Sequence, residues 1–416
     1  MKFLILSQYY PPETGAPQNR LHSLALNLVK NSCDVEVLTA MPNYPKMEIF
    51  EGYNGLSYKK ENIDGIKVHR SKIYVSKSKG VLKRLLNYFS FVISSIRVSN
   101  KLSKTDYIIC ESPPLFLGIS ALYISKKLNA KLIFNVSDLW PESAEKLDIV
   151  NNKFFLNLAY KLEKYLYNKS FLVTCQTQGI VANINKRFPH IPTLWLPNGI
   201  DKEVYDVPEN KDWIRDYGIE GKRIYVYAGI IGHAQGLDVI IKTKNWLVNN
   251  KFDLSKKVAF VIIGDGPEKQ RLEDLNEELK TNITFLPNTP KIEVLKMLKA
   301  CHGYIVPLKK LDLFLGAIPS KIFDALALSK PILLGVDGEA KSLFIDKGQA
   351  GIYFEPENEI SLAKAIIKLE NNPIQASIYG DSGFAYANKN FDRNNIAKKL
   401  LKMIQKLNII NQTLTI

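Results

Sequence analysis

The sequence predicts an α/β protein built from two doubly wound parallel sheets. Short apolar runs alternate with amphipathic segments from the first residue onward, which is the pattern of strands joined by crossover helices. The chain has 416 residues, too many for one ordinary hydrophobic core. A polar, proline-containing stretch at 194–212 interrupts the alternation near the middle. We therefore expect two sheet domains of similar size.

In the first half, apolar runs of four to nine residues mark the strands, and longer stretches with a period near 3.6 mark the helices. The strands are expected at 2–7, 34–40, 66–74, 107–112, 131–136 and 171–177. The helices are expected at 17–31, 80–102, 115–128 and 154–169, with one more after the last of these strands.

The second half starts the alternation afresh. Six short strands are expected at 223–229, 258–264, 282–287, 303–308, 331–335 and 351–356, with helices between them. In such sheets ligands bind beyond the carboxyl ends of the strands, so the loops at those ends are the places to look for a site.

The composition points to an anionic partner, and a basic charge that only aids solubility is the alternative. The chain has 56 Lys and Arg against 41 Asp and Glu, a net charge of +15. Its four cysteines lie far apart, which predicts buried free thiols and a reducing cytoplasm. The opening "MKFLILSQYY" has too short an apolar run for a signal peptide, and no run approaches the ~20 residues that span a bilayer.

One segment carries much of this charge. Residues 65–105 hold ten Lys or Arg and no Asp or Glu, mixed with large apolar residues at helical spacing. This pattern predicts a helix lying on an anionic membrane surface. The expected contact residues are Lys77, Lys79, Lys83, Arg84 and Arg97. A core helix with a solvated basic face is the alternative, and no nucleic-acid-binding motif accompanies the charge.

Two loops of the first half carry candidate chemistry. "SQYYPPETGAPQNR" follows the first strand, and Gly15 there can bring backbone N–H groups close to an anion. "FNVSDLWPES" places Asp138 and Glu142 at a strand's carboxyl end, where a general base or a hydroxyl-binding carboxylate would lie. Ser137 or Asp138 could instead cap the next helix.

Glycine-rich loops follow two strands of the second half. "YAGIIGHAQGLD" could cradle phosphate with the backbone around Gly232, with His233 as a nearby donor. "VIIGDGPEKQRLE" forms a sharp turn that begins at Gly264. This turn could contact a ligand or simply shape the crevice beside it.

A lysine stands in an unfavourable place in "GAIPSKIFDALALSKP". Lys321 lies in the first turn of an expected helix, at the positive end of the helix dipole. A diphosphate bound by Lys321, Ser320 and the free backbone N–H groups would supply the missing counter-charge. Asp324, one turn further on, could accept hydrogen bonds from a ribose diol. These features together favour a sugar nucleotide held between the two domains.

Seven motifs in this order resemble a known family. "YYPPETGAPQNRL", "MPNYP", "DLWPES", "PNGID", "AGIIGHAQGLD", "GDGPE" and "PSKIFDALALSKPI" are similar to those of retaining glycosyltransferases of family 4. The resemblance implies the GT-B fold, with two Rossmann-like domains facing a central cleft. It implies an acceptor domain at 1–198, a nucleotide-sugar domain at 199–388, and a final segment, 389–416, whose helix at about 394–407 crosses back to the first domain.

The resemblance also implies an activity. The nearest likeness is to bacterial O-antigen and capsule enzymes of the L-fucosamine transferase group, which move sugars such as N-acetyl-L-fucosamine from UDP onto a lipid-linked saccharide. It implies a UDP-sugar donor, a polyprenyl-diphosphate-linked acceptor, retention by front-face attack, no metal or other cofactor, no nucleic acid, and a peripheral place on the cytoplasmic face of the plasma membrane. The alternatives are a related enzyme acting on a free sugar nucleotide, such as an epimerase, and a non-catalytic module that binds anionic polymers.

The site residues follow motif by motif. The donor site would comprise Gly15, Gly232, His233, Gln235, Gly264, Thr289, Ser320, Lys321 and Asp324. The acceptor site would comprise Tyr44, Asp138 and Glu142, with Asp138 and Lys321 as the catalytic pair. The sequence departs from the family at Gly316, where a glutamate that binds the donor hexose is usual, and at His233 and Gln235, where Arg and Lys are usual. A 6-deoxy or otherwise modified donor sugar would fit these departures.

Overall fold

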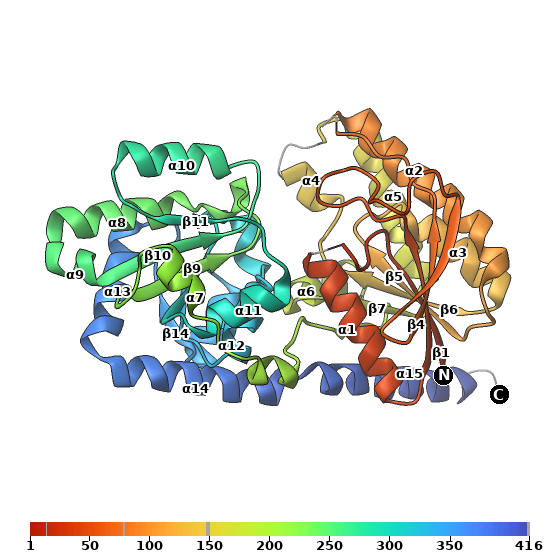
Figure 1. Cartoon of the computed structure of the whole chain (residues 1–416). Coiled ribbons are helices and arrows are strands. Elements are labelled where there is room, and N and C mark those ends of the chain that lie inside the picture. The colour runs from red at the N-terminus through yellow and green to blue at the C-terminus, as the bar shows by residue number, and fades with distance from the viewer. Residues whose placement is uncertain (14, 78–79, 147–149, 414–416) are drawn as a thin grey trace. The chain divides into compact units, whose positions relative to one another are not determined.

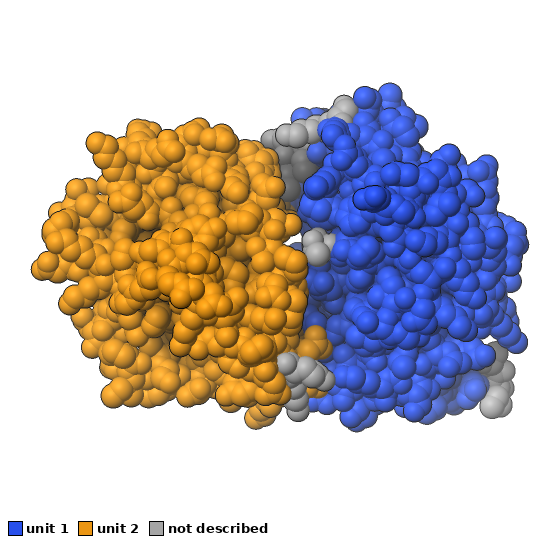
Figure 2. All heavy atoms as spheres, viewed as in Figure 1, with its two compact units in different colours: residues 1–198, 393–416 blue, residues 199–392 orange. Residues whose placement is uncertain are grey.

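The chain forms two compact units in the computed structural model, which describes residues 1–13, 15–77, 80–146 and 150–413. Unit 1 comprises Met1–Asn198 and Arg393–Ile416, and unit 2 comprises Gly199–Asp392 (Figures 1 and 2). The chain therefore builds most of unit 1, then all of unit 2, and finally returns to unit 1.

Unit 1 is organised around an eight-stranded sheet with the order β3-β4-β2-β1-β5-β6-β7-β8. The strands are β1 Lys2–Leu6, β2 Asp34–Ala40, β3 Tyr58–Ile63, β4 Ile66–Ser71, β5 Tyr107–Ser112, β6 Lys131–Val136, β7 Leu172–Cys175 and β8 Thr193–Trp195. All neighbours pair in parallel except β3, which pairs antiparallel with β4. The turn between these two strands uses Asp64 and Gly65, both at positive φ, as a two-residue hairpin requires.

Helices cover both faces of this sheet. They are α1 Ala16–Lys30, α2 Val81–Val98, α3 Leu117–Leu128, α4 Glu142–Lys146, α5 Lys153–Lys169, α6 Gln178–Arg187 and α15 Arg393–Thr413, with the short helix η1 at Ser99–Lys101. Successive side chains of β1 point to opposite faces, so Leu4 and Leu6 enter one core while Phe3 and Ile5 enter the other.

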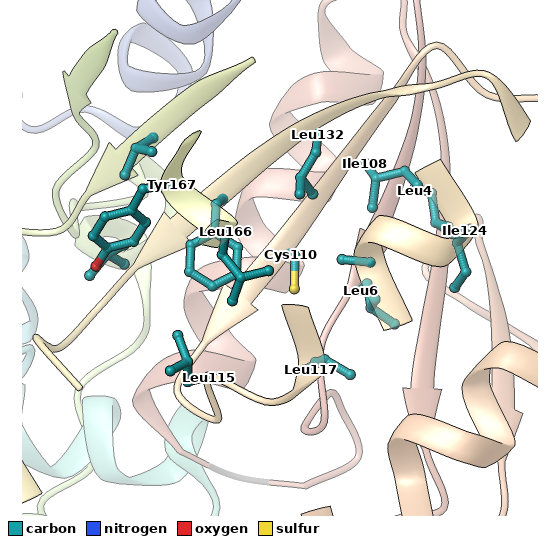
Figure 3. Packing of buried hydrophobic residues seen from close by; sticks show 14 of the residues in the cluster. Leu4, Leu6, Ile108, Cys110, Leu115, Leu117, Ile124, Leu132, Leu166 and Tyr167 are labelled. Atoms are coloured by element: carbon teal, nitrogen blue, oxygen red, sulfur yellow. The ribbon is translucent and has the colours of Figure 1, made fainter. Parts of the chain in front are cut away.

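Each core of unit 1 joins the sheet to a different set of helices. In the first core, Leu4 and Leu6 pack with Leu117 of α3 and Leu166 of α5, as Figure 3 shows, and α2 contributes Phe91. The second core contains residues of α1 and of α15, which pack against each other. α2, α3 and α5 therefore lie on one face of the sheet, and α1 and α15 lie on the other.

Unit 2 contains a six-stranded parallel sheet with the order β11-β10-β9-β12-β13-β14. The strands are β9 Arg223–Ala228, β10 Val258–Ile263, β11 Thr284–Leu286, β12 Gly303–Pro307, β13 Ile332–Gly335 and β14 Gly351–Tyr353. The α-helices are α7 Asp212–Asp216, α8 Asp238–Asn250, α9 Phe252–Lys257, α10 Lys269–Glu278, α11 Lys291–Lys299, α12 Lys321–Ala327, α13 Glu359–Asn371 and α14 Pro373–Asn390. Three short 3₁₀ helices, η2 Lys202–Asp206, η3 His233–Gln235 and η4 Asp312–Gly316, and a π-helix, η5 Lys341–Lys347, complete the unit.

The predicted fold class, two doubly wound parallel-sheet domains, is confirmed. The predicted free, buried state of Cys33, Cys110, Cys175 and Cys301 is also confirmed. The structure adds β3, β8 and α14, which were not predicted, and it ends β4 at Ser71, three residues before the predicted end of that strand. Within the described residues, no helix is both long and apolar enough to cross a bilayer.

Candidate active site

Two loops of unit 2 pack backbone against backbone at the carboxyl ends of β9 and β10. Gly264, which directly follows β10, has φ +144°, and a Cβ there would lie 2.0 Å from the carbonyl oxygen of Gly229. The Gly229 N–H donates to the Ile263 carbonyl at 2.9 Å, and the Ile231 N–H donates to the Asp265 carbonyl at 2.9 Å. Only glycine fits at position 264, so this predicted site residue shapes the loop pair.

Lys321 reaches this loop pair from the first residue of α12. Its Nζ donates to the Tyr227 hydroxyl at 2.9 Å and lies 4.4 Å from the centroid of that ring. The Tyr227 hydroxyl in turn donates to the Ile230 carbonyl at 2.5 Å. A Cβ at Gly229 would lie only 2.7 Å from the lysine Nζ, so the ammonium group lies directly beside the loop backbone.

Burial changes the chemistry of this lysine. Although the residue as a whole is half-buried, its ammonium group lies beside the Tyr227 ring, and among the described residues no carboxylate is in hydrogen-bond contact with it. Loss of hydration lowers the pKa of Lys321 to about 8, and Asp324 nearby offsets this only in part. An anion that reached the ammonium group would restore the missing counter-charge.

The other predicted residues of the phosphate loop are held by local contacts. His233 lies at the start of η3, with its Nδ1 2.9 Å from a Glu268 carboxylate oxygen, and its side chain is exposed. Glu268 also accepts from Arg271, whose guanidinium makes a bidentate pair with Asp238 and lowers the pKa of that carboxyl. The Gln235 side chain folds back over Gly232, where a Cβ would lie 2.9 Å from its Oε1.

The remaining predicted donor residues surround α12 and the end of β11. Ser320 is the N-cap residue of α12, but its side chain makes no capping hydrogen bond. The Asp324 carboxylate, assigned to the ribose by the resemblance, pairs with Lys291 Nζ at 3.0 Å. The Thr289 hydroxyl donates to the Pro287 carbonyl at 3.0 Å. Gly316, where the family glutamate is missing, ends η4.

A buried carboxylate organises the loop that follows β1 in unit 1. Glu13 is 2% exposed and accepts hydrogen bonds from the backbone N–H groups of Tyr10, Asn43 and Tyr44, at 3.1, 2.8 and 2.9 Å. Burial raises the pKa of Glu13, and the three N–H groups oppose this shift. The "YYPPE" and "MPNYP" motifs are thus joined by one side chain that sequence reasoning missed.

The joined loops place two tyrosines together. The rings of Tyr9 and Tyr44 lie 5.6 Å apart between centroids, and both side chains are partly exposed. Arg70 stabilises the loops by donating hydrogen bonds to the Pro11 and Ala40 carbonyl oxygens. Gly15, the N-cap residue of α1, is in extended conformation, and a Cβ there would collide with the Gln18 side chain at 2.4 Å.

Asp138 and Glu142 lie after β6, as predicted from the sequence. Asp138 is exposed, and one carboxylate oxygen accepts from the Ser143 hydroxyl at 2.8 Å. Glu142 is the first residue of α4 and accepts from Lys146 at 2.7 Å and from Asn183 at 3.3 Å. The structure thus brings Asp138 next to α4 through a side-chain contact with Ser143.

A second polar network, also missed from the sequence, crosses the ends of β5 and β6. Arg20 of α1 pairs with Glu111 and donates to Ser137 at 2.7 Å, and Asn135 donates to Glu111 at 2.6 Å. Glu111 is 3% exposed. The signal that could have found it is an acid inside the otherwise apolar strand "YIICES".

The predicted membrane-contact residues fall on and before α2. Lys83, Arg84 and Arg97 are exposed on that helix. Lys77 is exposed and paired with Glu48. Lys79 lies outside the described residues. Among the residues that the structure does describe, no group of three or more His, Cys, Asp or Glu side chains is arranged to hold a metal ion.

Comparison with known proteins places this site in context. The family model for group 1 glycosyl transferases matches residues 209–385. WcaI of Escherichia coli K12, provisionally named a colanic acid biosynthesis glycosyl transferase, is 24% identical over 420 residues, which cover 97% of this chain and all of WcaI.

Two solved structures are similar in fold. Sucrose-phosphate synthase of Thermosynechococcus elongatus has a TM-score of 0.75 at 14% identity, covering 98% of this chain and 99% of that chain. HepE of Anabaena, solved with UDP and glucose, has a TM-score of 0.71 at 15% identity, covering 98% of this chain and all of that chain. Residues 209–385 therefore match the group 1 glycosyl transferase family, and the chain as a whole has the two-domain GT-B fold.

Proposed function

We propose that this protein is a retaining glycosyltransferase that moves a sugar from a UDP-sugar donor onto a lipid-linked saccharide during bacterial surface polysaccharide synthesis. N-acetyl-L-fucosamine or another modified hexose is the donor sugar that we favour. The observation that carries the proposal is Lys321, a partly dehydrated cation beside the glycine loops of unit 2. Its surroundings need an anion, and a nucleoside diphosphate supplies one.

The donor would bind unit 2 through these loops. The diphosphate would accept hydrogen bonds from Lys321 and from loop N–H groups around Gly232, while Asp324 would leave Lys291 to accept from the ribose hydroxyls. HepE, which was solved with UDP and glucose, supports a nucleotide of this kind. Gly316 offers no carboxylate to the hexose, so the donor sugar would be one that needs fewer hydroxyl contacts there.

The acceptor would bind unit 1 beside the joined loops. Tyr9 and Tyr44 offer aromatic surface to a sugar ring, and Asp138 and Glu142 offer hydroxyl-binding carboxylates. The similarity to WcaI supports a polysaccharide acceptor. Lipid linkage would hold such an acceptor at the cytoplasmic face of the plasma membrane, which suits the basic segment containing α2.

The reaction would need no enzyme nucleophile. In front-face attack, the acceptor hydroxyl forms the new C1–O bond on the side from which the diphosphate departs, and its proton passes to the leaving diphosphate oxygen. Lys321 would stabilise the negative charge that develops on that oxygen. Asp138 would orient the attacking hydroxyl, and the loops would hold donor and acceptor next to each other in the geometry that this attack requires. The proposed reaction uses no metal ion, so we expect activity to persist in EDTA.

The experiment is a transfer assay with mass-spectrometric detection. The purified chain is incubated with a panel of UDP-sugars and polyprenyl-diphosphate-linked saccharides, and UDP binding is measured by calorimetry. We expect one donor to give a product heavier by one sugar residue, with the anomeric configuration retained by NMR. UDP binding without any transfer would favour an enzyme acting on the free nucleotide, and absence of UDP binding would refute the proposal.

Asp138→Asn tests the unit 1 assignment within the same assay. We expect UDP affinity to remain unchanged while the transfer rate falls by about 10²–10⁴-fold, the range for a lost acid–base or positioning group. Ser143→Ala, which removes only the hydrogen bond to Asp138, is the matched control and should cost far less. Full turnover by Asp138→Asn would remove this carboxylate from the mechanism.

A further inference from the structure

Three helices of unit 1 leave large apolar side chains exposed on one face of that unit. On α2, Leu82, Leu86, Phe89 and Ile93 are 72, 50, 37 and 50% exposed. Their spacing of four, three and four residues places them in one stripe along the helix. The opposite side of α2 is buried in the core through Phe91, whereas the stripe remains largely exposed.

The neighbouring helices continue the pattern. On α3, Ile119 and Tyr123 are 38 and 50% exposed. On α5, Phe154, Leu158 and Tyr165 are 80, 58 and 53% exposed, again at helical spacing. α2 contacts α3, α3 contacts α5, and all three pack on the same face of the sheet, so their outer sides belong to one layer (Figure 1).

The exposed charged side chains of these three helices are all basic. The three helices carry Lys83, Arg84, Arg97, Lys126, Lys127, Lys153, Lys161, Lys164 and Lys169. Their one acidic residue, Glu163, is 1% exposed and paired with Arg187. The exposed surface of these helices therefore combines apolar side chains with basic groups and presents no carboxylate.

We propose that α2, α3 and α5 together form one docking surface for an anionic lipid bilayer. Apolar side chains would enter the boundary between headgroups and acyl chains, while the lysines and arginines would contact lipid phosphates. The sequence suggested membrane contact through the basic segment around α2 alone, whereas this surface adds two helices and most of the apolar anchors. It rests on the proposed function for the lipid-linked acceptor, but binding to lipid is measurable without sugar transfer.

Helix α15, on the opposite face of the sheet, is the internal comparison. It also carries lysines and no acidic residue, among them Lys398 and Lys399, which are exposed. Within its described part, however, large exposed apolar side chains occur only at Ile409 and Ile410, near its end. Basic charge is thus shared by both layers, and the extended apolar surface is confined to α2, α3 and α5.

The test is co-sedimentation of the full chain with vesicles of phosphatidylcholine, with and without 30% phosphatidylglycerol. We expect binding to the anionic vesicles that weakens with added salt, since surface charges are screened. F154S/L158S on α5 and L86S/I93S on α2 should each weaken binding at least tenfold. I409S/I410S on α15 is the matched apolar control and should leave binding unchanged.

Charge variants separate this surface from α15. K126Q/K127Q on α3 should weaken vesicle binding by roughly 25-fold, since each basic group near the surface contributes about fivefold. K398Q/K399Q should have little effect. UDP binding by each variant, measured in solution, verifies that it is folded and tests the proposed function separately. The inference is overturned if only the α2 variants lose binding, if the α15 controls lose as much, or if the α5 variant changes the oligomeric state without affecting vesicle binding.

Discussion

Replacing Lys321 by methionine should change stability and donor affinity in opposite directions. The substitution keeps a flexible side chain of similar length but removes the ammonium group. Tyr227 keeps its hydrogen bond to the Ile230 carbonyl, so no buried hydroxyl is left without a partner. The variant therefore isolates the effect of the charge.

The magnitude follows from the pKa. Burial lowers the pKa of Lys321 from 10.5 to about 8, and each unit corresponds to about 1.36 kcal/mol of cost to the charged form. The cost is therefore roughly 3 kcal/mol at pH 7, reduced by about 1 kcal/mol for the hydrogen bond to Tyr227 that the variant loses. We expect Lys321→Met to raise the free energy of unfolding by about 2 kcal/mol.

Donor affinity should fall in the same variant. A charge-assisted hydrogen bond to the diphosphate contributes about 1.5–3 kcal/mol, which is roughly a 10- to 100-fold change in the dissociation constant for UDP. Urea unfolding at pH 7 gives the stability, and titration calorimetry gives the affinity. A variant that is less stable than the parent would refute the dehydration argument, and an unchanged UDP affinity would refute the phosphate role.

Three further predictions concern other parts of the two sites. First, UDP affinity should be highest below about pH 8 and should fall as the pH rises through that value, because the pKa of Lys321 is lowered to about 8 in the folded state. Calorimetry at pH 7, 8 and 9 would show this, and a constant affinity would exclude a charged lysine at the phosphate. Second, Gly264→Ala should lower the free energy of unfolding by more than 2 kcal/mol, since its Cβ would meet a carbonyl oxygen at 2.0 Å. Gly52→Ala, also at a positive φ but in open space, should cost only about 1 kcal/mol, and equal losses would contradict the packing argument. Third, Glu13→Gln should raise the KM for the acceptor without changing UDP affinity, because an amide cannot accept from all three backbone N–H groups as the carboxylate does; an unchanged KM would show that the loops do not depend on Glu13.

The sequence was sufficient for the architecture because the strands are strongly apolar. "DVEVLTA" and "YIICES" coincide with β2 and β5, since parallel strands covered on both faces must be apolar along their whole length. β3, "YKKENI", was not predicted because it lies at the sheet edge and four of its six residues are polar. α14 escaped because glycines and tyrosines obscure its helical period.

The candidate site was only partly accessible from sequence. The motifs identified the loops, because glycines and prolines in fixed order mark the ends of strands. They could not identify Glu13 or the Arg20–Glu111 pair, since these carboxylates act through partners up to 91 positions away in the chain. They also could not show that Asp324 pairs with Lys291, a contact made only when α11 and α12 come together.

The return of the chain to unit 1 has a consequence for synthesis. α15 supplies Ile396, Leu400 and Ile404 to the same core as Leu21 and Leu28 of α1. The residues of α15 that pack against α1 are therefore synthesised only after all of unit 2. Until then the nascent unit 1 exposes one apolar face of α1 to the cytosol, where it is open to chaperones and to misassembly. Unit 2, whose residues are continuous in sequence, can complete its fold first.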